Sequence, residues 1–558
     1  MDVGTTALKA VLLAPDGTAL GASERAYARG TTRGDSGLSG AMEQDPNEWI
    51  EAFAHAARDV LAPFGDAKPA GVALSGQMQN VVLARAGASL RPCLLYSDVR
   101  AVEEAEHIRR RLLEDGDADS VATGSFPLSN FKGAAACLCK WLWLARHDAE
   151  TLAEAETLLL GAHSFLAYAL CGGDRAAAAC DPTTASTTGL LSMGPSETET
   201  SARWAKEACG RFPGVDPALL PPLVLGFAPP PVGEVSSRTA NALGLPRNLE
   251  RVPVFHGVGD LASTTVGAVG VGQSSCGASY AYLGTSGWIA RVQTRDSAGA
   301  LPTLVTKNKN VDESKPTTFT LLHPDPALEI FAASMVTAGG NVEWARRVLL
   351  PGDFGGGDDS PTRFDAAASS APTGSEGVLF LPHLNGERSP FTDATARGCF
   401  VNLSPATTTG HMCRAVLEGV AYNYRALNDA LEAPDVSRRV SSTIGAPMPF
   451  LGGGAKSPLW TQILADATRH TLAPLPDAST VAARGCAAGA FERLGFWGPA
   501  SAEEKGGRAK PPAGYFPRDG GGDAVAPDAD AAATHDKNYE VWRKLHDALA
   551  GAGAGSLV

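Results

Sequence analysis

Residues 2–13 read DVGTTALKAVLL, a tight Gly-Thr turn followed by a run of β-forming side chains. The Pro-Asp-Gly sequence at 15–17 then reverses the chain, so the opening segment is predicted to be a β-hairpin. DPNE at 45–48 offers an N-cap, a proline at the first helical position and a capping-box glutamate for an amphipathic helix. GVALSG at 71–76 is typical of a buried strand. This order of elements indicates an α/β domain.

A similar hairpin recurs in mid-chain, where residues 282–292 read YLGTSGWIARV. Two such hairpins suggest two related halves that face one ligand; chance is the alternative, because Gly-Thr turns are common. FLGGGAKSPLW at 450–460 predicts a strand, a glycine-rich loop and a helix that Ser457 caps. Residues 411–431 have the apolar spacing of a long helix. The apolar stripe of the helix that follows Asp45 is Trp49, Phe53, Ala57 and Val60. The apolar stripe of the long helix is Val416, Val420, Tyr424 and Leu427.

Length and composition limit the class of protein. A chain of 558 residues is too long for one hydrophobic core, so two domains are expected. The net charge of −13 repels polyanions, which argues against nucleic acid as a partner. No apolar run reaches the roughly 18 residues of a membrane span. The ten cysteines are scattered without paired C-x-x-C modules, which argues against structural zinc and favours a reducing, cytoplasmic location.

The two ends of the chain carry separate expectations. The first strand begins directly after Met1, so we expect an N-terminally truncated gene model, from which an organelle-targeting peptide would also be missing. Residues 503–536 are of low complexity and are predicted to be disordered. Residues 538–550 are predicted to form a short helix that docks through Tyr539, Trp542 and Leu545.

The Gly-Thr turns and the glycine-rich loop are candidate phosphate sites. Backbone N–H groups converge at such turns, and a helix N-terminus favours an anion. Asp2 precedes the first turn and is a candidate magnesium ligand, or a carboxylate that only stabilises the turn. Lys9 either reaches a phosphate or is a solvated strand residue. For each turn alone the simpler interpretation is packing, but the three together favour nucleotide binding.

Asp260 lies in HGVGDLAST, at the junction of a strand-like run and a small-residue helix start. A carboxylate held there can act as a general base, or it can be a helix N-cap. GVGDLA also fits a loose dinucleotide fingerprint, but no clear βαβ unit with a ribose-binding acid follows. The sequence has no P-loop motif and no nucleophile elbow.

These motifs occur in an order that resembles the FGGY family of carbohydrate kinases, and within it the bacterial-type xylulose kinases. The likeness runs from residue 2 to about Trp497. Its motifs are DVGTT, SGQMQ, LYSDVRA, KWLWLARH, GVGD, YLGTSG, FLPHLNGERSP, ARGCF, HMCRAVLEGVA and GGGAKSPLW. The resemblance implies two related actin-like ATPase (ribonuclease H-like) domains with the active site in the cleft between them. It places the domains at 1–262 and 263–500, followed by a tail at 501–558.

The resemblance also implies the site residues and the reaction. Asp260 matches the general base, and Asp2 belongs to the magnesium region. The ATP-binding positions are Thr5, Thr6, Lys9, Gly284, Thr285, Ser286, Gly452, Gly453, Gly454 and Ala455. The sugar-binding positions are Gln77, Met78, Gln79, Asp98, Arg100 and Asp260. The implied reaction is phosphoryl transfer from MgATP to a ketose, D-xylulose first, by a monomer or homodimer.

One departure from the family bears on the substrate. The family reads Gly-Gln-Met-His where this chain has Gln79, and Tyr96-Ser97 replace a Trp-Asn pair. Glutamine donates and accepts hydrogen bonds but cannot carry a proton as histidine does. The nearest alternative is therefore a kinase of another ketose, such as ribulose or sedoheptulose. Two alternatives of other classes are a non-catalytic sugar- or nucleotide-binding protein and, on the GVGDLA match alone, a Rossmann oxidoreductase.

Overall fold

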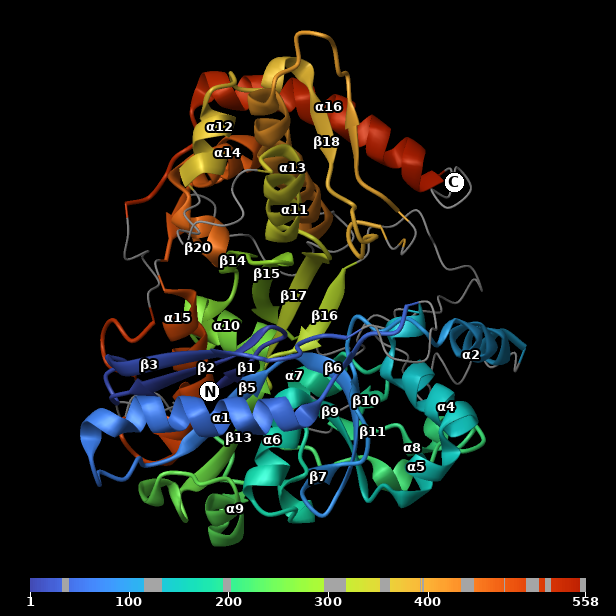
Figure 1. Cartoon of the computed structure of the whole chain (residues 1–558), viewed down its shortest axis with the longest axis vertical. Helices are drawn as coiled ribbons and strands as arrows, with labels where there is room; N and C mark the ends of the chain where they lie inside the picture. Colours follow the sequence, from blue (N-terminus) through green and yellow to red (C-terminus); the bar gives the residue numbers. More distant parts are fainter. Residues whose placement is uncertain are drawn as a thin grey trace.

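The computed structural model describes residues 1–32, 40–114, 133–193, 202–295, 318–351, 362–391, 393, 396–432, 446–475, 477–497, 511–516 and 523–551. The chain forms two lobes, each built on a six-stranded sheet (Figure 1). The N-terminal sheet and helix α1 occupy the lower part of the view, and helices α11, α13 and α16 occupy the upper part. Strands of the second sheet, β14 to β17, lie between them.

The N-terminal sheet mixes antiparallel and parallel strands. Its order is β12 (Gly233–Glu234), β13 (Pro253–Gly259), β5 (Val72–Gly76), β1 (Asp2–Val3), β2 (Ala7–Leu13) and β3 (Ala19–Ala26). β1 is antiparallel to β2 and parallel to β5, which is in turn parallel to β13. The helices α1 (Pro46–Leu61), α6 (Ala162–Leu170) and α9 (Ser237–Ala242) belong to this lobe.

The second sheet repeats this topology. Its order is β16 (Phe319–Leu322), β17 (Leu328–Met335), β15 (Gly287–Thr294), β14 (Ser279–Leu283), β20 (Met448–Leu451) and β21 (Leu472–Pro474). β14 is antiparallel to β15 and parallel to β20, which is parallel to β21. β14, β15, β17, β20 and β21 thus match β1, β2, β3, β5 and β13 in order and direction. The duplication predicted from the two hairpins is confirmed.

An additional layer extends the N-terminal lobe beside β5. Its sheet comprises β4 (Glu43–Gln44), β8 (Cys93–Leu94), β6 (Met78–Arg85), β7 (Ala88–Ser89) and β9 (Thr157–Gly161). The rest of the layer is α2 (Val102–Glu114), α4 (Cys137–His147), α5 (Ala149–Glu154), α7 (Pro182–Ser186), β10 (Leu191–Met193), β11 (Ala202–Trp204) and α8 (Lys206–Cys209). Leu83, Leu94, Trp141 and Leu158 are among the side chains of its apolar core.

The C-terminal lobe is covered by helices. They are α11 (Gly339–Leu349), α12 (Thr362–Ser369), α13 (Thr409–Glu432), α14 (Pro458–Thr468) and α16 (Ala529–Gly551), with the β18–β19 hairpin (Leu379–Leu381, Cys399–Val401) beside them. The predicted stripe of α13 is buried in this core, and the predicted stripe of α1 is buried in the other lobe. Both helices form because their apolar residues recur every three to four positions.

Two helices link the lobes. α10 (Asp260–Val269) packs Ala262 and Val269 against β14 and β15 of the second sheet. Its Ser263 hydroxyl bonds the Ser75 hydroxyl of β5 at 2.8 Å, inside the first lobe. α15 (Ala478–Arg493) packs along α10 and also contacts β2, β5 and β13. The domain boundary predicted at 262/263 falls within α10.

One of the predicted helix caps needs correction. Asp45 caps α1 by accepting from the Asn47 N–H at 2.9 Å, as predicted, but no capping box forms. The Glu48 carboxylate accepts instead from the Arg29 N–H at 2.7 Å and the Gly30 N–H at 3.2 Å, because these amides have turned toward it. Ser457 caps α14 by accepting from the Trp460 N–H at 3.0 Å.

The tail is more ordered than its composition predicts. α16 begins at Ala529, inside the stretch predicted to be disordered, and Tyr515 is fully buried in an aromatic cluster. Tyr539 and Trp542 are buried and Leu545 packs against the same core, which confirms the predicted docking. Apolar side chains at these few positions outweigh the polar background. In the part of the chain that the structure describes, no helix combines the length and apolarity of a bilayer crossing.

Candidate active site

Asp260 is the first residue of α10, directly after β13. A Cβ at Gly259, the N-cap, would lie 2.0 Å from the Met78 sulfur, so the Met78 side chain packs directly against this junction. The Asp260 carboxylate accepts from the Leu261 N–H at 2.8 Å. The alternative in which Asp260 is the N-cap is therefore wrong, and its carboxylate stands at a helix N-terminus next to Met78.

Asp2 lies on β1, opposite Lys9 on β2 and level with Ser75 on β5. Its Oδ1 atom is buried and has no hydrogen-bond partner among the described residues. Burial raises the pKa of the Asp2 carboxyl, while the Lys9 and His163 charges oppose this rise. A buried carboxylate oxygen without a donor is suited to a cation, because a cation removes the cost of burying the charge.

The charge of Asp2 acts on Asp260. Burial and the charge of Asp2 raise the pKa of Asp260 to about 7, with a further contribution from Asp181, and Arg388 of the C-terminal lobe opposes the rise. Burial and the charges of Asp2 and Asp260 also raise the pKa of Tyr282, on β14, to about 12. Residues of both lobes therefore share one electrostatic environment around Asp260.

The first Gly-Thr hairpin is fixed through its carbonyl groups. The Gly4 oxygen accepts from the Tyr27 hydroxyl at 3.0 Å and from the Gln77 side-chain amide at 3.4 Å. The backbone oxygen of Thr5 accepts from the Gln44 side-chain amide. The Thr5 hydroxyl donates to the hydroxyl oxygen of Tyr96 at 3.4 Å. The Gly4 N–H closes the turn by donating to the Ala7 oxygen at 3.1 Å, so the N–H groups of Thr5 and Thr6 are the candidate donors to a ligand.

The second hairpin joins three segments of the C-terminal lobe. The Gly339 N–H, at the start of α11, donates to the Gly284 oxygen at 2.8 Å, and the Gly340 N–H donates to the Thr285 oxygen at 3.1 Å. Gly452 approaches the strand that enters this hairpin so closely that a Cβ there would lie 2.2 Å from the Leu283 oxygen. The structure thus brings together the predicted second phosphate region, Gly284 to Ser286, and the predicted adenosine region, Gly452 to Ala455.

The predicted sugar residues fall into two groups. Gln77, Met78 and Gln79 follow β5 and lead into β6, and Met78 reaches Gly259 beside Asp260. The Gln77 Oε1 atom is buried without a partner among the described residues. Gln79 has a left-handed backbone with φ 60°, and its side-chain amide donates to the Thr187 oxygen at 2.7 Å. This first group lies next to the candidate base.

Asp98 and Arg100 form the second group and bond mainly to each other. The Asp98 carboxylate accepts from the Arg100 guanidinium at 2.7–3.0 Å and from the Met42 N–H at 2.8 Å. Arg100 also pairs with Glu43 at 2.8 Å and lies over the Trp143 ring at 4.9 Å. Both side chains are buried and their hydrogen bonds point inward, so direct contact with a sugar stays a prediction.

Several residues near the site were not predicted. Arg388 lies with its guanidinium 6.0 Å from the Tyr96 ring centre and acts on Asp260 from the other lobe. The Tyr282 ring stacks on Trp288 at 4.0 Å. Arg388 lies inside the motif FLPHLNGERSP. The motif therefore identified the segment as part of the family pattern, but it did not show that the Arg388 side chain acts on Asp260. The Gly339-Gly340 pair, at the end of a strand, was the available signal for α11.

A buried His-Asp-His group lies behind both acids. His163 and Asp181 are joined at 2.9 Å, and His256 is joined to the Ser164 hydroxyl at 2.9 Å. Although burial opposes it, the His163 hydrogen bond and charge lower the pKa of Asp181. The potential ligand atoms of His163, Asp181 and His256 lie within 4.8 Å of one another, but hydrogen bonds already engage all three side chains. We interpret the group as a hydrogen-bond network that keeps Asp181 ionised near Asp260.

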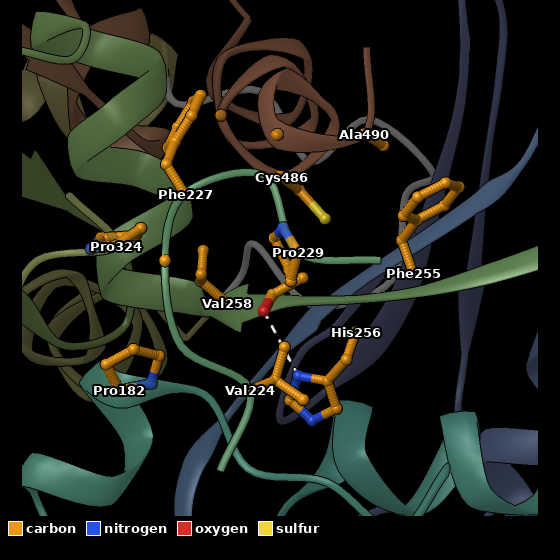
Figure 2. A pocket seen from close by; sticks show the side chains of 14 residues that line it. Pro182, Val224, Phe227, Pro229, Phe255, His256, Val258, Pro324, Cys486 and Ala490 are labelled. Atoms are coloured by element: carbon orange, nitrogen blue, oxygen red, sulfur yellow. Dashed lines mark hydrogen bonds between the residues drawn. The ribbon is translucent and has the colours of Figure 1, made fainter. Parts of the chain in front are cut away.

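A small cavity of about 20 Å³ lies beside β13, between α15 and the loop at 224–229 (Figure 2). Phe227, Pro229, Val258 and Cys486 are among the side chains that line it. The volume suits about one water molecule. None of the predicted site residues lines this cavity, so it belongs to the packing around the lobe connection rather than to the candidate site.

The chain is similar to known proteins over most of its length. Residues 1–267 match the N-terminal domain of the FGGY family of carbohydrate kinases, and residues 249–491 match its C-terminal domain. The chain is 26% identical to a xylulose kinase of Staphylococcus xylosus over 480 residues, which cover 85% of this chain and 86% of the relative. It is 28% identical to a xylulose kinase of Escherichia coli over 480 residues, 85% of each chain.

Solved structures show the same fold. A xylulose kinase from Brucella ovis superposes with a TM-score of 0.73 at 24% identity and covers 99% of both chains. A glycerol kinase from Plasmodium falciparum, solved with ADP, gives a TM-score of 0.70 at 17% identity, over 98% of this chain and 96% of that one. The fold is that of actin-like ATPases, and a Rossmann oxidoreductase is excluded. The chain belongs to the FGGY family of carbohydrate kinases.

Proposed function

We propose that this carbohydrate kinase transfers the γ-phosphoryl group of ATP to a hydroxyl of a ketose, with D-xylulose as the first candidate and D-xylulose 5-phosphate as its product. The observation that carries the proposal is the position of Asp260. It begins a helix between the two lobes, carries a pKa raised to about 7, and responds to charges from both lobes. A base near neutrality suits proton removal from an alcohol.

The proposed mechanism requires only one proton transfer to a side chain of the protein. Asp260 accepts the hydroxyl proton while the sugar oxygen forms a bond to the γ-phosphorus and the bond from that phosphorus to the ADP oxygen breaks. Such a reaction depends on positioning and on neutralising charge. The backbone N–H groups of the two hairpins are assigned to the phosphates, with the hydroxyls of Thr5, Thr6, Thr285 and Ser286.

Asp2 is assigned to magnesium. Its orphaned buried oxygen, and the burial that raises the pKa of the Asp2 carboxyl, fit a hard divalent cation held by oxygen ligands. When bound, Mg²⁺ supplies positive charge that offsets the phosphate oxygens. Lys9, opposite Asp2 on the neighbouring strand, adds positive charge on the same side of the hairpin.

The nucleotide base is assigned to the glycine-rich loop. The loop connects β20 to α14 and comprises Gly452, Gly453, Gly454 and Ala455, of which Gly452 and Gly454 lie against Leu283. The loop has few side chains, so a flat ring can approach its backbone. Because the same strand leads into Gly284, a nucleotide bound along this line would point its phosphates toward the second hairpin.

The sugar is assigned to the segment next to Asp260. Gln77, Met78 and Gln79 lie there, and Asp98 and Arg100 brace the neighbouring loop. Gln79 stands where the family reads histidine, and its amide N–H is engaged with Thr187. Because glutamine replaces the family's histidine at this position, D-ribulose and sedoheptulose are the alternative acceptors.

The test is a substrate panel with purified protein. ADP release from MgATP is measured with D-xylulose, D-ribulose and sedoheptulose, and ³¹P NMR identifies the product. We expect D-xylulose to give the highest kcat/KM. A higher kcat/KM for another ketose would reassign the substrate to that sugar. The absence of any ketose-dependent ADP release would contradict the proposed reaction and favour a non-catalytic binding protein.

The ten cysteines are free, which supports a cytoplasmic location, because thiols persist in a reducing compartment. Fractionation of cells that express a tagged protein tests this. The assembly proposed is a monomer or homodimer, which sedimentation measures.

A further inference from the structure

Lys140 is a buried lysine in the motif KWLWLARH, on α4, and the phosphoryl transfer described above does not use it. Its side chain is 0% exposed. Among the described residues its ammonium group has no carboxylate partner and bonds two backbone oxygens: Gln79 O at 2.6 Å and Leu95 O at 2.9 Å. A buried ammonium is costly, so this position calls for a specific explanation.

The two carbonyls belong to the two segments assigned to the sugar. Gln79 lies in the segment after β5, and Leu95 precedes Tyr96 in the loop that leads to Asp98 and Arg100. The Asp98 N–H also donates to the Leu95 oxygen, at 3.0 Å. Lys140 therefore lies behind both segments and holds them from the protein side.

The backbone at Gln79 is unusual. Its φ of 60° is left-handed, which few residues other than glycine adopt. The pairing of β6 with β9 also shifts register between Met78 and Val82, so Gln79 lies in an irregular stretch of the strand. Irregular stretches of this kind re-aim side chains, and surrounding contacts must maintain them. The Lys140 bond to the Gln79 oxygen is such a contact.

Two more links join the same parts. The Asn80 side-chain oxygen accepts from the Tyr96 N–H at 3.0 Å, directly between the two segments. Trp143, one turn along α4 from Lys140, carries the Arg100 guanidinium on its ring. α4 is thus the common support of Gln79, Leu95 and Arg100.

We propose that Lys140 is a positioning residue that sets the sugar specificity of the enzyme by fixing the Gln79 segment against the Leu95–Arg100 loop. It touches neither nucleotide hairpin. The proposal depends on the proposed sugar kinase activity, which it deepens by naming what orients the sugar site.

The main variant is Lys140→Met, which keeps length and packing but removes the charge and all donors. The variant leaves the Gln79 oxygen without this donor, so Tm is expected to fall, but the Leu95 oxygen keeps the Asp98 N–H and no buried charge is left unpaired, so the variant is expected to fold. We expect KM for the ketose to rise about tenfold or more and discrimination among ketoses to fall, because small misplacements near a reacting group are costly. KM for ATP should stay within about twofold, and Lys140→Arg should recover part of the sugar affinity.

The matched control is Leu142→Ala on the same helix, which removes buried packing without touching either carbonyl. It is expected to lower Tm while leaving the ratio of the two KM values unchanged. Equal changes in both KM values of Lys140→Met, or the same sugar-specific rise in Leu142→Ala, would overturn the proposal. If the methionine variant is insoluble, Lys140→Gln, whose donor reaches one bond less far, takes its place under the same criteria.

Hydrogen exchange separates this proposal from the activity. In the variant that replaces Lys140, the amides of 77–80 and 95–98 should exchange faster, while those of the hairpins at 4–6 and 284–286 should not change. Uniform or absent changes would overturn the positioning role. If the wild-type protein phosphorylates no ketose, the proposed function fails, and the exchange result still decides whether Lys140 holds the two segments.

Discussion

The two Gly-Thr hairpins occupy equivalent places in the two sheets but differ in what they carry. The residue two positions before the glycine is Asp2 in the first hairpin and Tyr282 in the second. Asp2 faces Lys9 across the strands, whereas Tyr282 faces Trp288 and stacks on it at 4.0 Å. One scaffold thus supports an ionic site in the first copy and an aromatic, packed site in the second.

The two turns also differ in length. Val3 pairs with Leu8, so four residues form the first turn, whereas Leu283 pairs with Gly287 and three residues form the second. The backbone oxygen of Tyr282 also accepts from the Tyr424 hydroxyl of α13. The duplicated fold supplies two equivalent turns, to which we assign the phosphates, whereas the two acids to which we assign the metal ion and the proton transfer lie on β1 and at the start of α10.

The largest effect is expected from Asp260→Asn. Loss of the base should lower kcat about 10³- to 10⁴-fold, because the amide cannot accept the proton. ATP binding, measured by calorimetry on the same variant, should survive, since neither hairpin changes. Turnover within tenfold of wild type would remove Asp260 from its role.

The equivalent positions Asp2 and Tyr282 give the sharpest contrast between the hairpins. Asp2→Asn should lower kcat about 100-fold and raise the Mg²⁺ concentration needed for half-maximal rate, because an ionised oxygen is lost. Tyr282→Phe, which keeps the stacked ring, should change kcat less than about threefold. Similar losses from both variants would contradict the division of roles between the two copies.

Gly452 and Gly453 test the glycine-rich loop as a matched pair. Gly452 has φ 97° and no room for a Cβ, whereas a Cβ at Gly453 meets nothing within 4 Å. Gly452→Ala should destabilise the protein by about 1–3 kcal/mol and raise KM for ATP several-fold. Gly453→Ala should leave Tm nearly unchanged. Thermal unfolding and ATP kinetics distinguish the two, and equal effects would show that backbone strain is not the cause.

The smallest effect concerns pH. Asp260 acts as a base only when ionised, so kcat/KM for the ketose should rise with pH and level off above an apparent pKa near 7. Arg388 opposes the rise of that pKa, so Arg388→Gln should move the limb to higher pH by a few tenths of a unit. A shift to lower pH, or none, would contradict the proximity of Arg388 to the base.

Local patterns in the sequence predicted much of this structure. The hairpins, α1, α13 and α14 follow from turn residues, caps and apolar spacing, all of which act over a few neighbouring residues. The duplication followed from one short match and was confirmed by strand order. The prediction of a capping box at Glu48 was wrong, because the fold places the N–H groups of Arg29 and Gly30 where they donate to the Glu48 carboxylate.

Contacts between distant segments could not be predicted in this way. Nothing near Asp98 indicates that its carboxylate turns inward to Arg100 and Met42, and nothing near Lys140 indicates two carbonyls 61 and 45 residues away. The action of Arg388 on Asp260 joins opposite lobes. Such arrangements depend on the assembled fold, so the motifs indicated the segments of the site but not how their side chains are oriented.

The most direct test of the central claim is a crystal structure with Mg²⁺, a non-hydrolysable ATP analogue and D-xylulose. We expect the γ-phosphate to lie between the turns at 4–6 and 284–286, and a sugar hydroxyl to lie within hydrogen-bond distance of the Asp260 carboxylate. A nucleotide bound away from either turn, or a sugar with no hydroxyl near Asp260, would contradict it.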